Sequence, residues 1–170
     1  MDRRLLSVLI TAGVFVLDRL TKVLIKGHFS AFDSLPVIPG LFNIVHTENP
    51  GIAFGMLAEA NHYWWRSAVL IGFSLVVLAV VSAILLRPAS AALHAMLRTA
   101  LALVLGGAAG NFYDRVVNGT VTDFVELHAG PYYFPAFNVA DSAITVGACL
   151  LLLDMWFSRE RKGQPVNVPR

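Results

Sequence analysis

The sequence has few charged residues, and this shortage excludes several classes of protein. Only 14% of the 170 residues are charged, and the mean hydropathy is +0.66. Soluble domains carry about 25% charged residues, so this composition predicts a membrane protein. The net charge is +2, and no basic patch interleaved with aromatic residues is present. We therefore expect no nucleic-acid partner.

Cysteine is almost absent as well. Cys149 is the only cysteine, so no disulfide within the chain and no thiolate metal cluster can form. Because it lies in an apolar run, we expect it to be a buried packing residue. His46, His62 and His128 are far apart and form no HxxxH or HExxH motif, and GxSxG is missing too. The sequence thus predicts neither a metal site nor another cofactor.

Four apolar segments are long enough to cross a bilayer, which takes about 20 residues. They are residues 5–25, 65–86, 93–111 and 140–157. The connection 87–92 is short, so the second and third segments are predicted to form a tight hairpin. The connections 28–64 and 112–139 are long. We predict a single membrane domain, residues 1–170, with four transmembrane helices.

Basic residues orient these spans through the positive-inside rule. Of the 13 Lys and Arg, the larger group falls on the side of the termini: Arg3, Arg4, Arg87, Arg98, Arg159, Arg161, Lys162 and Arg170. Only Lys26, Arg66 and Arg115 fall on the other side. The rule predicts cytoplasmic termini and outward-facing long loops. Because these loops hold most of the acids and four of the five histidines, we expect any chemistry at the outer surface.

The first outer loop is predicted to contain short strands. Residues 35–45 are rich in β-branched and aromatic side chains. Asn49-Pro50-Gly51 is a turn, and the apolar residues 52–57 are predicted to form an interfacial flap. A loop that only shields the helix ends is the alternative.

The second outer connection begins in a run of small residues, 106–110, which favours close helix packing. Asp114 and Arg115 follow, and we interpret them as a solvated ion pair at the helix end. Asn118-Gly119 is a type I′ turn signal.

Two aspartates stand out at the outer ends of the last two spans, where carboxylates are costly unless they are used. Alternation over residues 121–127 predicts an extended segment in which Asp123 shares a face with aliphatic residues, which raises its pKa. Asp141 fits the third position of a helix capped by Asn138, and the helix dipole favours its ionised form. One environment favours a protonated carboxyl and the other an ionised one, so the two aspartates suit an acid and base pair. Structural capping and an ion or proton pathway are the alternatives.

Asp18 and Lys22 are four residues apart, so they face the same side of the first helix near its outer end. They form either a buried ion pair that neutralises its own charges or a support, on the neighbouring helix, for the site of Asp123 and Asp141.

Five motifs in order resemble bacterial lipoprotein signal peptidase, the signal peptidase II family of aspartic peptidases. They are DRLTK at 18–22, ENPGIAF at 48–54, GGAAGNFYDR at 106–115, VTDF at 121–124 and FNVAD at 137–141. Almost the whole chain is covered. The resemblance implies a four-helix membrane core with a small β cradle and a short interfacial helix on the outer, periplasmic side.

The resemblance also implies an activity and a site. A member of this family is an endopeptidase of the bacterial inner membrane that removes the signal peptide of a diacylglyceryl-modified prolipoprotein, cleaving on the amino side of the lipidated cysteine. Its catalytic aspartates correspond to Asp123 and Asp141. Its supporting polar residues correspond to Asp18, Lys22, Asn49, Gly51, Asn111, Arg115 and Asn138. The expected partners are the lipidated substrate and membrane lipid, and we expect a monomer.

Two other classes of protein would also keep acids in a membrane. A small ion or proton transporter places them near the midplane between repeated halves, and no internal repeat is visible. A scaffold protein would use them for capping and packing. A presenilin-type aspartic protease would need a GxGD motif, which the sequence lacks.

Overall fold

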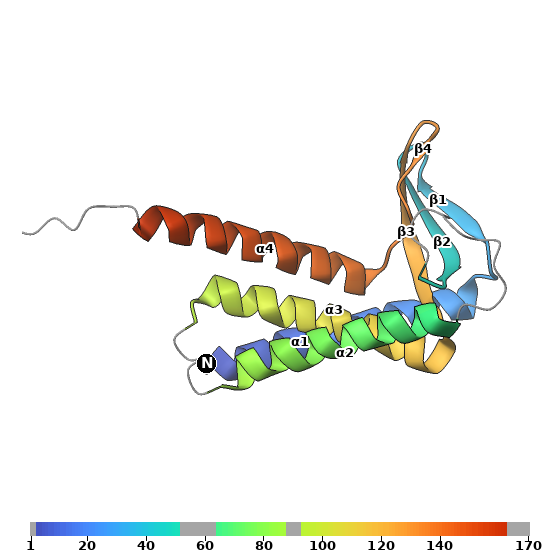
Figure 1. Cartoon of the computed structure of the whole chain (residues 1–170). Coiled ribbons are helices and arrows are strands. Elements are labelled where there is room, and N and C mark those ends of the chain that lie inside the picture. The colour runs from blue at the N-terminus through green and yellow to red at the C-terminus, as the bar shows by residue number, and fades with distance from the viewer. Residues whose placement is uncertain (1–2, 52–63, 88–92, 163–170) are drawn as a thin grey trace, which may run out of the picture.

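Four helices lie alongside one another and carry a four-stranded sheet at one end (Figure 1). The computed structural model describes residues 3–51, 64–87 and 93–162. In chain order the elements are α1 (Arg3–His28), β1 (Ser34–Ile38), β2 (Phe42–Asn49), α2 (Trp64–Leu86), α3 (Ala95–Asn118), β3 (Val121–Ala129), β4 (Tyr132–Tyr133) and α4 (Val139–Lys162). α1 begins and α4 ends at the end of the bundle away from the sheet.

Within the described residues, three helical stretches are long and apolar enough to cross a membrane: Ser67–Leu86, Ala95–Asn118 and Val139–Phe157. These match three of the four predicted spans. α1 has 26 residues, but it carries Asp18, Arg19 and Lys22 near its sheet end. Many large apolar side chains on the helices are exposed, such as Phe73 and Leu152 at 67% and 66%. A lipid environment accommodates such a surface.

α3 is longer than predicted, because it continues to Asn118 rather than ending near residue 111. Gly119 caps it in the left-handed conformation, with φ 77°, and its N–H donates to the carbonyl oxygen of Arg115 at 3.2 Å. The predicted type I′ turn at 118–119 is therefore wrong. Since the helix continues, Asn111, Asp114 and Arg115 lie within it.

The sheet has the order β1-β2-β3-β4, and all its pairs are antiparallel. Strands predicted within 35–45 are confirmed by β1 and β2. Thr47 pairs with Asp123 and Asn49 pairs with Val121 across β2 and β3. The predicted flap at 52–57 lies outside the described residues, within which α1 to α4 are the only helices.

Small residues bring α3 close to its neighbours, as predicted. A Cβ on Gly107 would overlap the carbonyl oxygen of Ala140 and lie 2.8 Å from Cγ1 of Ile144, both on α4. A Cβ on Gly106 would lie 2.8 Å from the Thr11 carbonyl oxygen on α1. Cys149, in contrast, is exposed on α4, so the prediction of a buried packing cysteine is wrong. α4 instead packs through small buried residues such as Ala140.

Candidate active site

Both predicted aspartates line one cavity at the sheet end of the bundle. The cavity has a volume of about 570 Å³. Asn49, Asp123 and Asp141 form its polar wall, and residues 134–137 with Val146 form an apolar wall. Such a mixture of an apolar surface and a few polar groups is typical of ligand sites.

Asn138 connects the two acids. Its side-chain amide donates to Oδ1 of Asp123 at 2.7 Å, and its backbone N–H donates to Oδ2 of Asp141 at 3.2 Å. Its own Oδ1 accepts from the N–H of Asp141 at 3.0 Å. The reciprocal pair is the capping arrangement that the sequence predicted at the start of α4. Asn138 is 0% exposed, so its amide is held in one orientation by these partners.

Backbone pairing with β3 places Asn138 beside Asp123. Phe137 bridges Val125 of β3 through two backbone hydrogen bonds, 2.8 Å and 3.0 Å long. The chain therefore enters α4 directly beside β3. Asp123 lies in that strand, as the alternation predicted, and is 2% exposed.

Asn49 approaches Asp123 from the neighbouring strand. Its Nδ2 donates to Oδ2 of Asp123 at 2.9 Å, while its Oδ1 accepts from the N–H of Gly51 at 2.8 Å. The second bond determines which side of the amide faces the acid. Gly51 has φ 91°, a conformation that favours glycine, and a Cβ there would overlap Leu70 of α2.

Asn111 holds Asp141 from α3. Its Nδ2 donates to Oδ1 of Asp141 at 2.7 Å, and its Oδ1 accepts from Nζ of Lys22 at 3.2 Å. Both oxygens of Asp141 are thus hydrogen-bonded, one from each side. Asn111 thereby connects Lys22 on α1 to Asp141 on α4.

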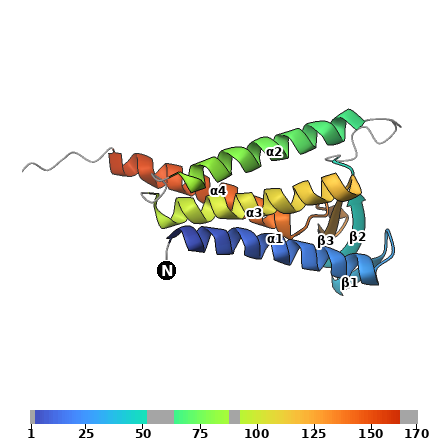
Figure 2. The ribbon, with the colours of Figure 1, turned by 90° about the horizontal axis from the view of Figure 1, so that it is seen from below.

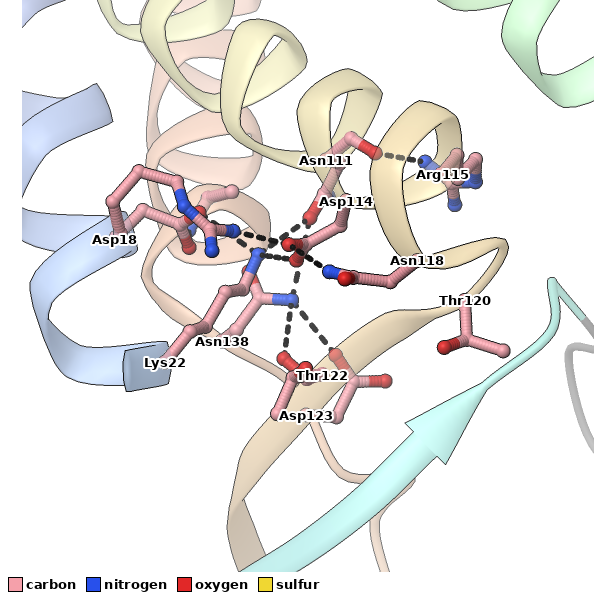
Figure 3. Close-up of polar contacts among 12 residues, drawn as sticks. Asp18, Lys22, Asn111, Asp114, Arg115, Asn118, Thr120, Thr122, Asp123 and Asn138 are labelled. Atoms are coloured by element: carbon pink, nitrogen blue, oxygen red, sulfur yellow. Dashed lines mark hydrogen bonds and ion pairs between the residues drawn. The ribbon is translucent and has the colours of Figure 1, made fainter. Parts of the chain in front are cut away.

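Behind Asn111 lies a buried cluster of charges (Figure 3). Nζ of Lys22 lies 2.8 Å from Oδ2 of Asp18 and 2.8 Å from Oδ2 of Asp114. Arg19 also pairs with Asp114, and its guanidinium lies 4.4 Å above the ring of Tyr113. Asp18, Lys22 and Asp114 are 0% exposed. Oδ1 of Asp18 accepts from the N–H of Ala140 at 3.0 Å, which ties α1 to the first turn of α4.

Asp114 is a residue whose role the sequence analysis missed. The prediction that Asp114 is a solvated partner of Arg115 is wrong, because Asp114 is buried and pairs with Lys22 and Arg19. The physical reason is that α3 does not end before Asp114. Once α3 continues through 118, Asn111 and Asp114 are three residues apart and face the same side, toward α1.

Arg115 lies near the acids but bonds to neither in the structure. Its Nη1 donates to the carbonyl oxygen of Asn111 at 3.3 Å. Its Nε is buried without a hydrogen-bond partner among the described residues. A buried donor of this kind is available to a group that enters the site.

Glu48 forms a second network on the other face of β2, which the sequence analysis also missed. It lies 3.1 Å from Lys26 and 3.1 Å from His46, and Thr120 donates to it at 2.6 Å. Burial raises the pKa of Glu48, but the hydrogen bonds from Thr120, His46 and Lys26 outweigh this and lower it to about 2. The only sequence signal is its place next to Asn49, since alternation turns the two side chains to opposite faces.

The pKa of Asp123 is raised to about 6. Burial is the main cause, and the charge of Asp141 adds to it, while the hydrogen bonds from Asn49 and Asn138 oppose it. The predicted direction is confirmed.

The two described histidines of the three, His46 and His128, have separate partners. His46 bonds to Glu48 and to the Phe29 carbonyl oxygen, His128 stacks on Tyr133 with centroids 4.8 Å apart, and His62 lies outside the described residues. The absence of a metal and of other cofactors stays a prediction.

Comparison with known proteins gives the family. A family model described as Signal peptidase (SPase) II matches residues 10–157. The chain is 44% identical over 146 residues to the lipoprotein signal peptidase of Solibacter usitatus, covering 86% of this chain and 87% of that one. It is 45% identical over 152 residues to that of Pseudomonas aeruginosa, covering 89% and 88%. A solved bacterial membrane enzyme superposes with a TM-score of 0.79 at 30% identity, covering 96% and 94% of the two chains.

Fold, spans and relatives together define a multi-pass enzyme of bacterial membranes, an aspartic peptidase. The chain belongs to the signal peptidase II family, Peptidase_A8, as its five motifs predicted.

Proposed function

We propose that this enzyme removes the signal peptide from diacylglyceryl-modified prolipoproteins by cleaving on the amino side of the lipidated cysteine, with Asp123 and Asp141 as the catalytic pair. The observation that carries the proposal is that both acids line one cavity and are joined by Asn138. The lipoprotein signal peptidases to which the chain is similar support the substrate class.

The raised pKa of Asp123 supports its role as the acid. Two nearby carboxyls cannot both ionise cheaply, so one keeps a proton while the other accepts one from water. We assign Asp141, in the first turn of α4, as the base, and Asp123 as the acid. Because the two groups titrate together, the labels are exchangeable over the reaction cycle.

The reaction then needs no covalent intermediate. A water between the acids gives its proton to Asp141, and its oxygen attacks the scissile carbonyl carbon. Asp123 donates its proton to the carbonyl oxygen as negative charge develops there. Breaking the C–N bond then requires Asp141 to return its proton to the amine, while the hydroxyl proton of the intermediate returns to Asp123.

Substrate placement follows from the position of the cavity. We propose four spans, with α1 included because its charges are buried in ion pairs, and cytoplasmic termini. The cavity then lies at the periplasmic face of the bacterial inner membrane. A diacylglyceryl group stays in the leaflet beside the apolar wall of 134–137 and Val146, which holds the bond near the acids.

Supporting residues have separate roles in this proposal. Asn49, Asn111 and Asn138 orient the two carboxyls, and Lys22 with Asp18 fixes Asn111 and the start of α4. Gly51 fixes the amide of Asn49. Arg115 presents its buried Nε to the substrate backbone. The protein acts as a monomer with a single membrane domain.

A cleavage assay tests the proposal. Purified wild type should cleave a lipidated precursor and leave the same precursor without lipid intact. Asp123→Asn and Asp141→Asn should each abolish cleavage, whereas Asp154→Asn, at a buried carboxylate paired with His94, should retain it. Cleavage by both dyad variants would overturn the assignment. Ion flux in liposomes without cleavage would favour a transporter.

A further inference from the structure

A second cavity is lined by other helices than the cavity that holds the acids. It has a volume of about 500 Å³ and is lined by α1, α2 and α3. Figure 2 shows α1 and α2 on opposite sides of α3, so this groove lies between them with α3 as its floor. Among the described residues, the two cavities share no lining residue.

The groove is apolar along its length. Val8 and Phe15 of α1, Leu85 of α2 and Leu105 of α3 line it. On α3 it runs from Arg98 to Ala109, about 16 Å at 1.5 Å per residue. This length and volume suit an extended acyl chain better than a compact polar ligand.

One end of the groove is basic. Arg4 of α1 and Arg98 of α3 line it there, and none of the described residues that line it is acidic. Arg98 is only 3% exposed, and its Nη2 lies 3.3 Å from the hydroxyl of Ser7, which directs the guanidinium toward α1. Both arginines lie in the first turn of their helices, where the helix dipole also favours an anion.

We propose that this groove binds an anionic phospholipid, with the phosphate between Arg4 and Arg98 and an acyl chain along Val8, Phe15, Leu85 and Leu105. Basic pockets between membrane helices are suited to anionic lipid headgroups, and the arginine fork matches phosphate oxygens. The proposed peptidase reaction does not require this lipid, so the two proposals can fail separately.

Thermal unfolding of the purified full chain in a neutral detergent tests the binding. Phosphatidylglycerol should raise Tm by about 5 °C near saturation, whereas phosphatidylcholine and free glycerol 3-phosphate should not. Arg98→Gln and Arg4→Gln should each weaken the apparent affinity by about fivefold. Arg87→Gln is the matched control and should bind normally, because this exposed arginine directly follows α2 and does not line the groove.

A second pair of variants tests the acyl chain. Ala12 lines the groove, so Ala12→Phe should fill it and abolish the shift, whereas Ala79→Phe, on the exposed surface of α2, should not. Because Arg4 and Ala12 are exposed positions, their variants remain informative even where Arg98→Gln fails to fold. Equal shifts with both lipids, or an unchanged shift in both Arg4→Gln and Ala12→Phe, would overturn the proposal.

Discussion

The side-chain amide of Asn138 lies 2.7 Å from Oδ1 of Asp123, so the residue that caps α4 also orients the acid of β3. Its backbone N–H binds Asp141 in the same turn. One asparagine thereby fixes both carboxyls relative to each other, although they come from different elements.

Replacing Asn138 should therefore affect catalysis and folding together. Asn138→Ala leaves the buried carboxyl of Asp123 without one hydrogen-bond partner, which costs about 1–3 kcal/mol, and removes a helix cap, which contributes about 1 kcal/mol. We expect kcat to fall by about 10 to 100-fold and Tm to fall as well. Asn43→Ala is the control. It removes a side-chain amide that donates to Glu126 at 2.8 Å, and this hydrogen bond lies away from the cavity, so the variant should keep kcat. Normal kcat in Asn138→Ala would contradict this role.

Protonation of Asp123 should make stability depend on pH. Its pKa is about 6 in the folded protein and 3.8 ordinarily, so the folded chain keeps a proton there that the unfolded chain has lost. Stability from this group is therefore greatest below pH 3.8 and decreases as pH rises to about 6, by at most about 3 kcal/mol.

Measurements of Tm between pH 4 and pH 8 check this dependence. Asp123→Asn should lose the decrease and should be at least as stable as wild type at pH 8. Asp33→Asn, at an exposed acid, should follow the wild-type curve. Parallel curves for wild type and Asp123→Asn would show that Asp123 does not carry the proton.

Lys22 neutralises two buried acids, so its loss should be severe. Lys22→Met leaves Asp18 without its cation and should lower the free energy of unfolding by about 3–5 kcal/mol. Lys26→Met breaks a pair with Glu48 that is about one-third exposed, and should cost less than about 1 kcal/mol. Denaturation of both variants in detergent makes the comparison, and similar losses would contradict it.

Asp114 should act as a positioning residue through Lys22 and Asn111. Asp114→Asn keeps the Asp18 pair, so we expect the chain to fold but kcat to fall by about tenfold with KM little changed, as Asn111 loses its fixed place beside Asp141. Asp114→Glu, which retains the charge, should recover part of the loss. A change in Tm with normal kcat would limit Asp114 to a structural role.

Two glycine-to-alanine substitutions, at Gly107 and Gly13, should change the stability of the chain in opposite directions. Gly107→Ala should destabilise the chain by about 1–3 kcal/mol, because its Cβ meets the backbone of Ala140 and α4 must move. Gly13→Ala on α1 meets nothing within 4 Å and should stabilise by about 0.5–1 kcal/mol. Tm values of the two variants should shift in opposite directions, and a shared direction would contradict the packing argument.

Local pattern determined much of this protein from the sequence alone. Hydrophobic length predicted the three apolar spans that the structure describes, and alternation predicted β3. The pair Asp18 and Lys22, and the cap of Asn138 with Asp141, were predictable because helical spacing places their members on one face. In each of these two pairs the residues lie within about one helical turn of each other in the sequence.

Only the tertiary structure decided which of these local features meet. Asp123 reaches Asn138 because Phe137 pairs with Val125, and Asp114 reaches Lys22 because α3 continues to Asn118 and packs on α1. Strand pairing and helix packing join residues far apart in the chain, and neither leaves a periodic trace in the sequence. The burial that raises the pKa of Asp123 arises from those same long-range contacts.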